Sequence, residues 1–166
     1  MIESKHPDFK IRFATKSDVA LILSFIKQLA EYEKLSHEVV ATEALLEQTL
    51  FGKRQVAEVI FGEYRGQAVG FALFSQNFST FLGRPGIHLE DLYVKPEMRG
   101  KGLGKIMLSY LAHLAKERDC GRLEWWVLDW NEPSINFYKS LGATPMDEWT
   151  VFRITGKTLD DLASAF

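Results

Sequence analysis

The pattern of apolar and polar residues predicts strands and helices that alternate along the chain. Strand-like patterns are found at residues 9–14, 56–64, 67–78, 87–94, 122–130 and 148–154. Helical periodicity is found at residues 17–35, 42–51, 105–119, 131–141 and 157–166. Thr15 and Asp18 match a capping box before the first helix. Residues 1–8 are polar and are expected to form a loose leader. Residues 77–86 contain glycine and proline and are expected to form a flexible loop.

The order of these elements predicts an α/β fold with a mixed sheet. Strands joined by hairpins come first, and a β-α-β-α-β half follows, so helices are expected on both faces of the sheet. The chain has 166 residues, of which 46% are hydrophobic and 25% charged. This composition excludes general disorder and fits one domain spanning residues 1–166.

Charge and cysteine content narrow the possible partners. Twenty basic and 22 acidic residues give a net charge of −2, which argues against a nucleic-acid binder. The single cysteine, Cys120, excludes an internal disulfide, and the four histidines share no metal-binding spacing, so no metal site is expected. No apolar stretch is long enough for a membrane span. We therefore expect a cytoplasmic protein that acts on a small molecule.

The strongest local motif is the glycine turn Arg99–Gly104 between a predicted strand and a predicted helix. Glycines let backbone N–H groups approach a phosphate, and the helix N-terminus adds partial positive charge. The sequence contains no Walker A motif, and Lys105 and Met107 stand where a dinucleotide-binding fingerprint needs glycine. A glycine-rich helix start without a ligand is the structural alternative.

Several strings together resemble the GNAT N-acetyltransferases. The turn fits their [RQ]-x-x-G-x-[GA] pyrophosphate loop, preceded by Leu89-Glu90-Asp91 and followed by residues 130–139 (WNEPSINFYK) and 141–143 (LGA). These strings, with residues 26–33 (IKQLAEYE), are most similar to the spermidine/spermine (diamine) and thialysine acetyltransferases. The resemblance implies the GNAT acyl-CoA N-acyltransferase fold, acetyl-coenzyme A as cosubstrate and a homodimer, in which Trp125, Trp126 and Trp130 are candidate interface residues.

The resemblance also implies which residues bind the coenzyme. These are Leu92, Tyr93, Val94, Arg99, Gly100, Lys101, Gly102, Leu103, Gly104, Lys105, Asn131, Ser134, Phe137 and Tyr138. Within this set, the backbone N–H near Leu92 would meet the oxyanion, and the strand end would pair with the pantetheine arm.

Acetyl transfer to an amine needs a base for the ammonium and an acid for the leaving thiolate. Glu90 is the candidate base, acting through a water. The adjacent carboxylates Glu90 and Asp91 lie in an otherwise apolar strand, and burying them would cost free energy unless they had a function. Tyr138 is the candidate acid, because the resemblance implies that the tyrosine of this motif faces the coenzyme sulfur, and a phenol with a pKa of about 10 can protonate a leaving thiolate. The alternatives are ion pairs from Glu90 and Asp91 to Arg99 or Lys95, and a core role for Tyr138. Strand alternation predicts that Asp91 faces away from Glu90.

The acceptor site is expected to be acidic. Glu33, Phe81, Glu90, Asp91 and Trp149 are its candidate lining residues, with Glu33 and Trp149 implied by the resemblance. Phe81 stands in a loop where the polyamine enzymes tend to carry tryptophan, and this departure weakens the expectation of a polyamine substrate. The predicted function is acetylation of a polyamine, a diamine or a lysine-like amino acid such as thialysine. A protein or peptide acetyltransferase and a non-catalytic acyl-CoA-binding module are the alternatives.

Overall fold

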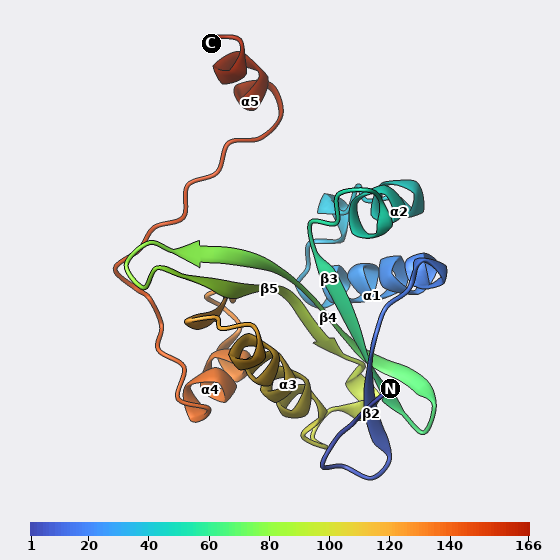
Figure 1. Ribbon diagram of the computed structural model, residues 1–166. Helices are drawn as coiled ribbons and strands as arrows, with labels where there is room; N and C mark the ends of the chain where they lie inside the picture. The colour runs from blue at the N-terminus through green and yellow to red at the C-terminus, as the bar shows by residue number, and fades with distance from the viewer. The chain divides into compact units, whose positions relative to one another are not determined.

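The computed structural model describes all residues, 1–166, and contains one six-stranded sheet (Figure 1). The strands follow one another across the sheet in chain order. They are β1 (Ile2–Glu3), β2 (Phe9–Phe13), β3 (Glu58–Tyr64), β4 (Gln67–Ser79), β5 (Arg84–Val94) and β6 (Arg122–Trp125). Neighbours from β1 to β5 are antiparallel, and β5 and β6 are parallel. The expected mixed sheet is therefore confirmed.

Two compact units make up the chain, Met1–Trp126 and Val127–Phe166. The first unit contains the whole sheet and three α-helices, α1 (Val19–Tyr32), α2 (Glu43–Phe51) and α3 (Leu103–Glu117). The second contains α4 (Glu132–Ser140) and α5 (Gly156–Ala163). Short 3-10 turns lie at Lys16–Asp18, Ser36–Glu38 and Pro96–Met98. None of the helices combines the length and apolar character that a membrane crossing requires.

Helices of the first unit cover both faces of its sheet. Phe25 of α1 stacks on Phe71, with the ring centroids 5.3 Å apart, and lies edge-on to Tyr93 of β5. On the opposite face, a Cβ atom at Gly62 or Gly70 would come within 3.0 or 3.1 Å of the Met107 sulfur of α3. α1 and α2 therefore cover one face of the sheet, and α3 covers the other. The sequence predicted helices on both faces.

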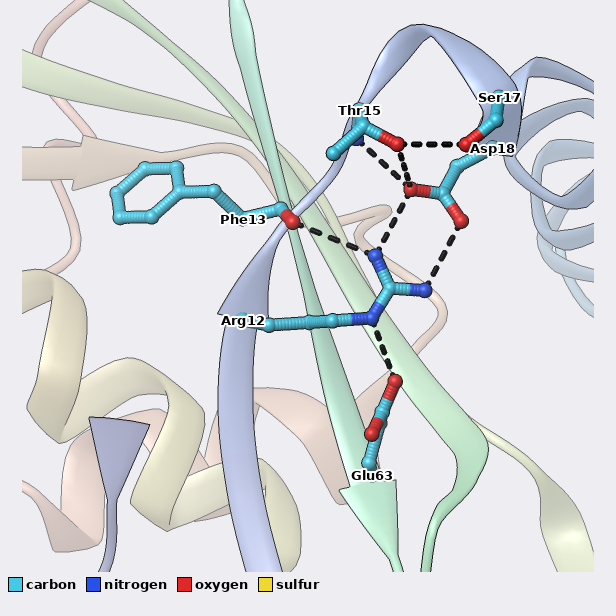
Figure 2. Close-up of polar contacts among 6 residues, drawn as sticks. All are labelled: Arg12, Phe13, Thr15, Ser17, Asp18 and Glu63. Atoms are coloured by element: carbon cyan, nitrogen blue, oxygen red, sulfur yellow. Dashed lines mark hydrogen bonds and ion pairs between the residues drawn. The ribbon is translucent and has the colours of Figure 1, made fainter. Parts of the chain in front are cut away.

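The start of the first helical segment is tied to the sheet by a charged network (Figure 2). The capping box between Thr15 and Asp18 is present as predicted. Arg12 of β2 donates two hydrogen bonds to Asp18, at 2.8 and 2.9 Å, and a third to Glu63 of β3. Hydrogen bonding to Arg12 is the main reason why the pKa of Asp18 falls to about 2. This carboxylate therefore stabilises the fold above about pH 4, and its contribution is lost as the pH falls toward 2.

Two of the expected irregular segments are more ordered than the sequence predicts. In the expected loose leader, Ile2 and Glu3 pair with β2. In the expected loop 77–86, residues continue the β4–β5 ladder as far as the pair Ser79 and Arg84. The turn itself is short and is closed by Gly83, whose φ of +62° suits glycine. The glycine and proline residues of this stretch correctly indicate a hairpin, but the loop that they predict is longer than the turn in the structure.

Two expected strands are shorter or missing. β6 ends at Trp125, although the apolar pattern continues to residue 130. Residues 148–154 have the composition of a strand but form no regular element. A strand needs a partner for its backbone hydrogen bonds, and sheet order β1–β6 provides none for this segment. The prediction of a last strand at residues 148–154 is therefore wrong for the single chain.

Candidate active site

The glycine turn forms an exposed N-terminus for α3. Gly100 and Gly102 have φ values of +78° and +75°, which non-glycine residues rarely adopt. Gly102 is the N-cap residue, and no side chain caps the helix, so its first backbone N–H groups remain available to a ligand. Lys101 and Lys105 are exposed beside this N-terminus. The turn therefore has the backbone donors and the charge that a pyrophosphate needs.

Arg99 of the same turn is held differently from the two lysines. Its Nε donates a hydrogen bond to the Val94 carbonyl oxygen at 3.0 Å. Its guanidinium carbon lies 4.7 Å from the centroid of the Tyr32 ring and 5.4 Å from that of Tyr93. Arg99 thus joins the glycine turn to the end of β5 and to the end of α1.

Parallel pairing between β5 and β6 covers only the first part of β5. The ladder runs from Gly86 paired with Arg122 to Leu89 paired with Trp125. Beyond it, residues 91–94 are paired with β4 alone. Their other edge is without a strand partner and leads directly to the glycine turn. An extended ligand can hydrogen-bond to such an edge as an added strand would.

A β-bulge changes the direction of side chains at Glu90. Asp91 pairs with Leu73 and Leu89 pairs with the adjacent Phe74, so Glu90 has no partner on β4. Leu89 and Asp91 consequently lie on opposite faces of the sheet. The prediction that Asp91 faces away from Glu90 is wrong, because regular alternation does not hold across a bulge.

The bulge brings carboxylates together on the face that α1 covers. The pKa of Asp91 is raised to about 7, mainly by burial and in part by the negative charges of Glu90 and Glu33. Glu33 follows the last residue of α1 and is partly buried, which raises the pKa of its own carboxyl. Three of the predicted acceptor residues therefore belong to one electrostatic cluster. A cation placed among them would relieve the repulsion.

The remaining predicted coenzyme and acceptor residues of the first unit differ in exposure. Tyr93 is buried against Phe25, whereas Leu92 and Val94 are partly buried on β5. Leu103 is buried at the start of α3, and Gly104 is partly buried. Phe81 is 96% exposed in the β4–β5 turn. Buried Leu103 and Tyr93 present no side chain to solvent, so a ligand would meet them through their backbone.

The second unit carries the other predicted residues on or near α4. Asn131 is the N-cap residue, and its Oδ1 accepts a hydrogen bond from the Ser134 backbone N–H at 3.4 Å. Phe137 and Tyr138 are both partly buried, with ring centroids 5.4 Å apart. Trp149 is 72% exposed in the segment between α4 and α5. Asn131 therefore has a structural role within this unit.

One contact at the site was not predicted from the sequence. Nε2 of His88 lies 3.2 Å from Oε2 of Glu90. The two residues are separated by one position on a strand, and this spacing was the signal available in the sequence. No group of three or more His, Cys, Asp or Glu side chains is placed to hold a metal ion.

Comparison with known proteins gives the family. The model of the Acetyltransferase (GNAT) family matches residues 25–143. The chain is 41% identical over 164 residues to thialysine N-epsilon-acetyltransferase from Bos taurus, with 92% of this chain and 96% of the relative covered. It is 32% identical to an L-ornithine N5-acetyltransferase from Arabidopsis thaliana, with 90% and 86% covered.

A solved structure agrees with the sequence relatives. An integron cassette protein from the mobile metagenome of V. cholerae superposes with a TM-score of 0.79 at 27% identity, covering 94% of this chain and 98% of that one. The chain belongs to the GNAT acetyltransferase family and has its fold. It is an N-acetyltransferase, and family membership implies acetyl-coenzyme A as its cosubstrate. The non-catalytic alternative is thereby set aside.

Proposed function

We propose that this enzyme acetylates a primary amine of a small molecule that carries a second positive charge. Polyamines, diamines and lysine-like amino acids such as thialysine form this class. The observation that carries the proposal is the cluster of Glu33, Glu90 and Asp91, in which mutual repulsion helps to raise the pKa of Asp91 to about 7. A cationic substrate would pair with this cluster, and thialysine and ornithine acetyltransferases among the relatives support the substrate class.

The coenzyme side is assigned to the glycine turn and the free edge of β5. Backbone N–H groups at the start of α3, with Lys101 and Lys105, would hold the pyrophosphate. The unpaired edge at residues 90–94 would hydrogen-bond to the pantetheine arm. The backbone N–H near Leu92 would stabilise the oxyanion that forms when the amine attacks the thioester. A donor of this kind typically contributes several kcal/mol to transition-state stabilisation.

Proton transfers in the reaction are assigned to Glu90 and Tyr138. An alkyl ammonium has a pKa of about 10.4, so it must lose a proton before it attacks. Glu90 accepts this proton through a water and passes it to solvent, and the neutral amine nitrogen bonds to the acetyl carbon to give the tetrahedral oxyanion. As the oxyanion collapses, the carbon–sulfur bond breaks and the Tyr138 hydroxyl gives its proton to the leaving thiolate. The second proton of the former amine nitrogen then restores the Tyr138 hydroxyl. Direct attack in a ternary complex needs no acyl-enzyme.

Asp91 and Glu33 are assigned to substrate binding. The pKa of Asp91, about 7, also suits a general base at neutral pH, so its role must be separated from that of Glu90 by experiment. Phe81 and Trp149 are proposed as aromatic walls of the acceptor site. A lysine side chain of a protein could satisfy the same carboxylates, and a lysine peptide therefore belongs in the substrate test.

Activity with a panel of amines tests this proposal. Thiol release from acetyl-coenzyme A is measured with spermidine, spermine, putrescine, thialysine, ornithine, lysine and a lysine peptide. We expect turnover with dicationic small amines and about tenfold lower kcat/KM with the peptide. Tyr138→Phe should lower kcat by about 100-fold while coenzyme affinity is kept. Tyr110→Phe is the matched control, because Tyr110 is also partly buried but lies on α3 against Phe13.

Two outcomes would contradict the proposal. Equal or better turnover of the lysine peptide would assign the enzyme to protein substrates. Unchanged kcat in Tyr138→Phe would remove this residue from the proton transfer. The proposal also includes a cytoplasmic location, the absence of a metal and a homodimer. The side chains of Trp126 and Trp130, which are 59% and 49% exposed, support the homodimer as candidate interface residues.

A further inference from the structure

His88 and Glu90 form a contact that connects a partly buried ring to an exposed carboxylate. The side chain of His88 is 20% exposed and that of Glu90 is 60% exposed. An exposed glutamate without a partner samples several rotamers, and fixing it costs conformational entropy. Glu90 also sits at a bulge, where the ladder does not hold its backbone. The imidazole is therefore the group that restricts where the Glu90 carboxylate lies.

Trp126 holds the imidazole in place. The ring centroids of His88 and Trp126 are 5.4 Å apart, and the planes meet at 71°, an edge-to-face arrangement. Such pairs stabilise a fixed ring orientation. A ring fixed by packing can direct its Nε2 atom toward one acceptor, which here is Glu90.

The neighbouring charges leave Glu90 as the main partner of His88. On β6, Glu124 is the Cα register partner of His88. Its Oε1 already accepts a hydrogen bond from Asn77 at 3.0 Å and lies 3.0 Å from Arg122 Nε. On β4, the register partner of His88 is the uncharged Ser75. Asp91 on β5 and Glu33 after α1 are further carboxylates near Glu90, and Lys95 and Arg99 lie farther along this face, against Phe25 and Tyr93.

We propose that His88 is a positioning residue that orients the Glu90 carboxylate. This inference rests on the proposed function of Glu90. The His88 Nε2–H donates a hydrogen bond to the carboxylate and keeps it aimed at the proton that it must accept.

Two substitutions separate the ring from its hydrogen bond. His88→Phe keeps an aromatic ring against Trp126 but removes the hydrogen-bond donor, whereas His88→Gln keeps an N–H donor but removes the ring. The matched control is His113→Phe on α3, which removes a histidine that also lies 3.2 Å from a glutamate, Glu117. Steady-state kinetics use the amine with the highest kcat/KM in the panel, and acetyl-coenzyme A affinity and Tm are measured for every variant.

The expected result is a loss of kcat without a loss of coenzyme binding. His88→Phe should lower kcat by about tenfold at about pH 8, and His88→Gln should stay within about threefold of the unsubstituted enzyme.

A double-mutant cycle with Glu90→Gln completes the test. If His88 acts through Glu90, His88→Phe should change kcat by less than about twofold in the Glu90→Gln background. An equal loss in both backgrounds, or a loss of kcat in His88→Gln as large as that in His88→Phe, would overturn the inference while the proposed function stands. If the unsubstituted enzyme acetylates no amine of the panel, the proposed function fails and this inference fails with it.

Discussion

At the scale of single residues, Asp91 connects the stability of the fold with recognition of the substrate. Its carboxyl is buried next to Glu90 and Glu33, and its pKa is raised to about 7. An aspartate in the unfolded chain has a pKa of about 3.9. Ionisation of Asp91 therefore opposes folding: the cost is absent below about pH 4, grows between pH 4 and 7, and is fully present above pH 7.

Replacing Asp91 by the uncharged asparagine should stabilise the fold and impair acceptor binding. We expect Asp91→Asn to raise the free energy of unfolding at about pH 8 by about 1 to 3 kcal/mol and to have no such effect below about pH 4. The KM for the amine at pH 8 should rise about tenfold, because one carboxylate of the cluster is lost. Urea unfolding at several pH values and steady-state kinetics measure the two effects.

The exposed Asp160 of α5 provides the control for this substitution, since Asp160→Asn should change neither quantity. A lower stability of Asp91→Asn at pH 8 would mean that the carboxylate makes favourable contacts that outweigh its burial. An unchanged KM would place the substrate cation away from Asp91.

At the scale of elements, the glycine turn before α3 requires a backbone that only glycine adopts readily. Gly102→Ala introduces a side chain at a φ of +75°, although no atom lies within 4 Å of the added Cβ. We expect a loss of about 1 kcal/mol in stability and, because the first turn of α3 shifts, an approximately tenfold weaker affinity for acetyl-coenzyme A. Thermal unfolding and equilibrium binding measure the two effects.

Gly66→Ala is the matched control, because Gly66 has a φ of +79° in the β3–β4 turn and equally open surroundings. It should lose the same stability and bind the coenzyme normally. Equal coenzyme affinity in both variants would show that the start of α3 does not contact the coenzyme.

The elements also show what the sequence can and cannot predict. Periodicity and capping residues located α1 and α2 to within a few residues, and the glycine turn was placed correctly between β5 and α3. The bulge at Glu90 was not predicted, because an extra residue in a ladder is set by the pairing of β5 with β4. As a result, the face of Asp91 and its proximity to Glu90 and Glu33 came from the structure alone, whereas alternation along the strand already placed His88 and Glu90 on one face.

At the scale of the whole molecule, the order of elements predicted the mixed sheet correctly. The segment 148–154 shows what such a prediction cannot include, namely whether a strand has a partner. Its apolar side chains are exposed, Val151 by 56%, Phe152 by 92% and Ile154 by 44%. The alternation typical of a strand is present, yet this chain alone offers no strand to pair with it. A pattern in one sequence cannot tell whether the partner belongs to the same chain or to a second copy.

The proposed homodimer predicts that a second copy covers these side chains. Light scattering after size exclusion should give about twice the chain mass of 19.0 kDa at micromolar concentration. Phe152→Lys should shift the population to monomer, because a charge in an apolar interface is costly to desolvate. Val40→Lys is the control, since Val40 is 83% exposed in the first unit and should leave the mass unchanged. A monomeric unsubstituted enzyme would refute the dimer, and a dimeric Phe152→Lys would place its interface elsewhere.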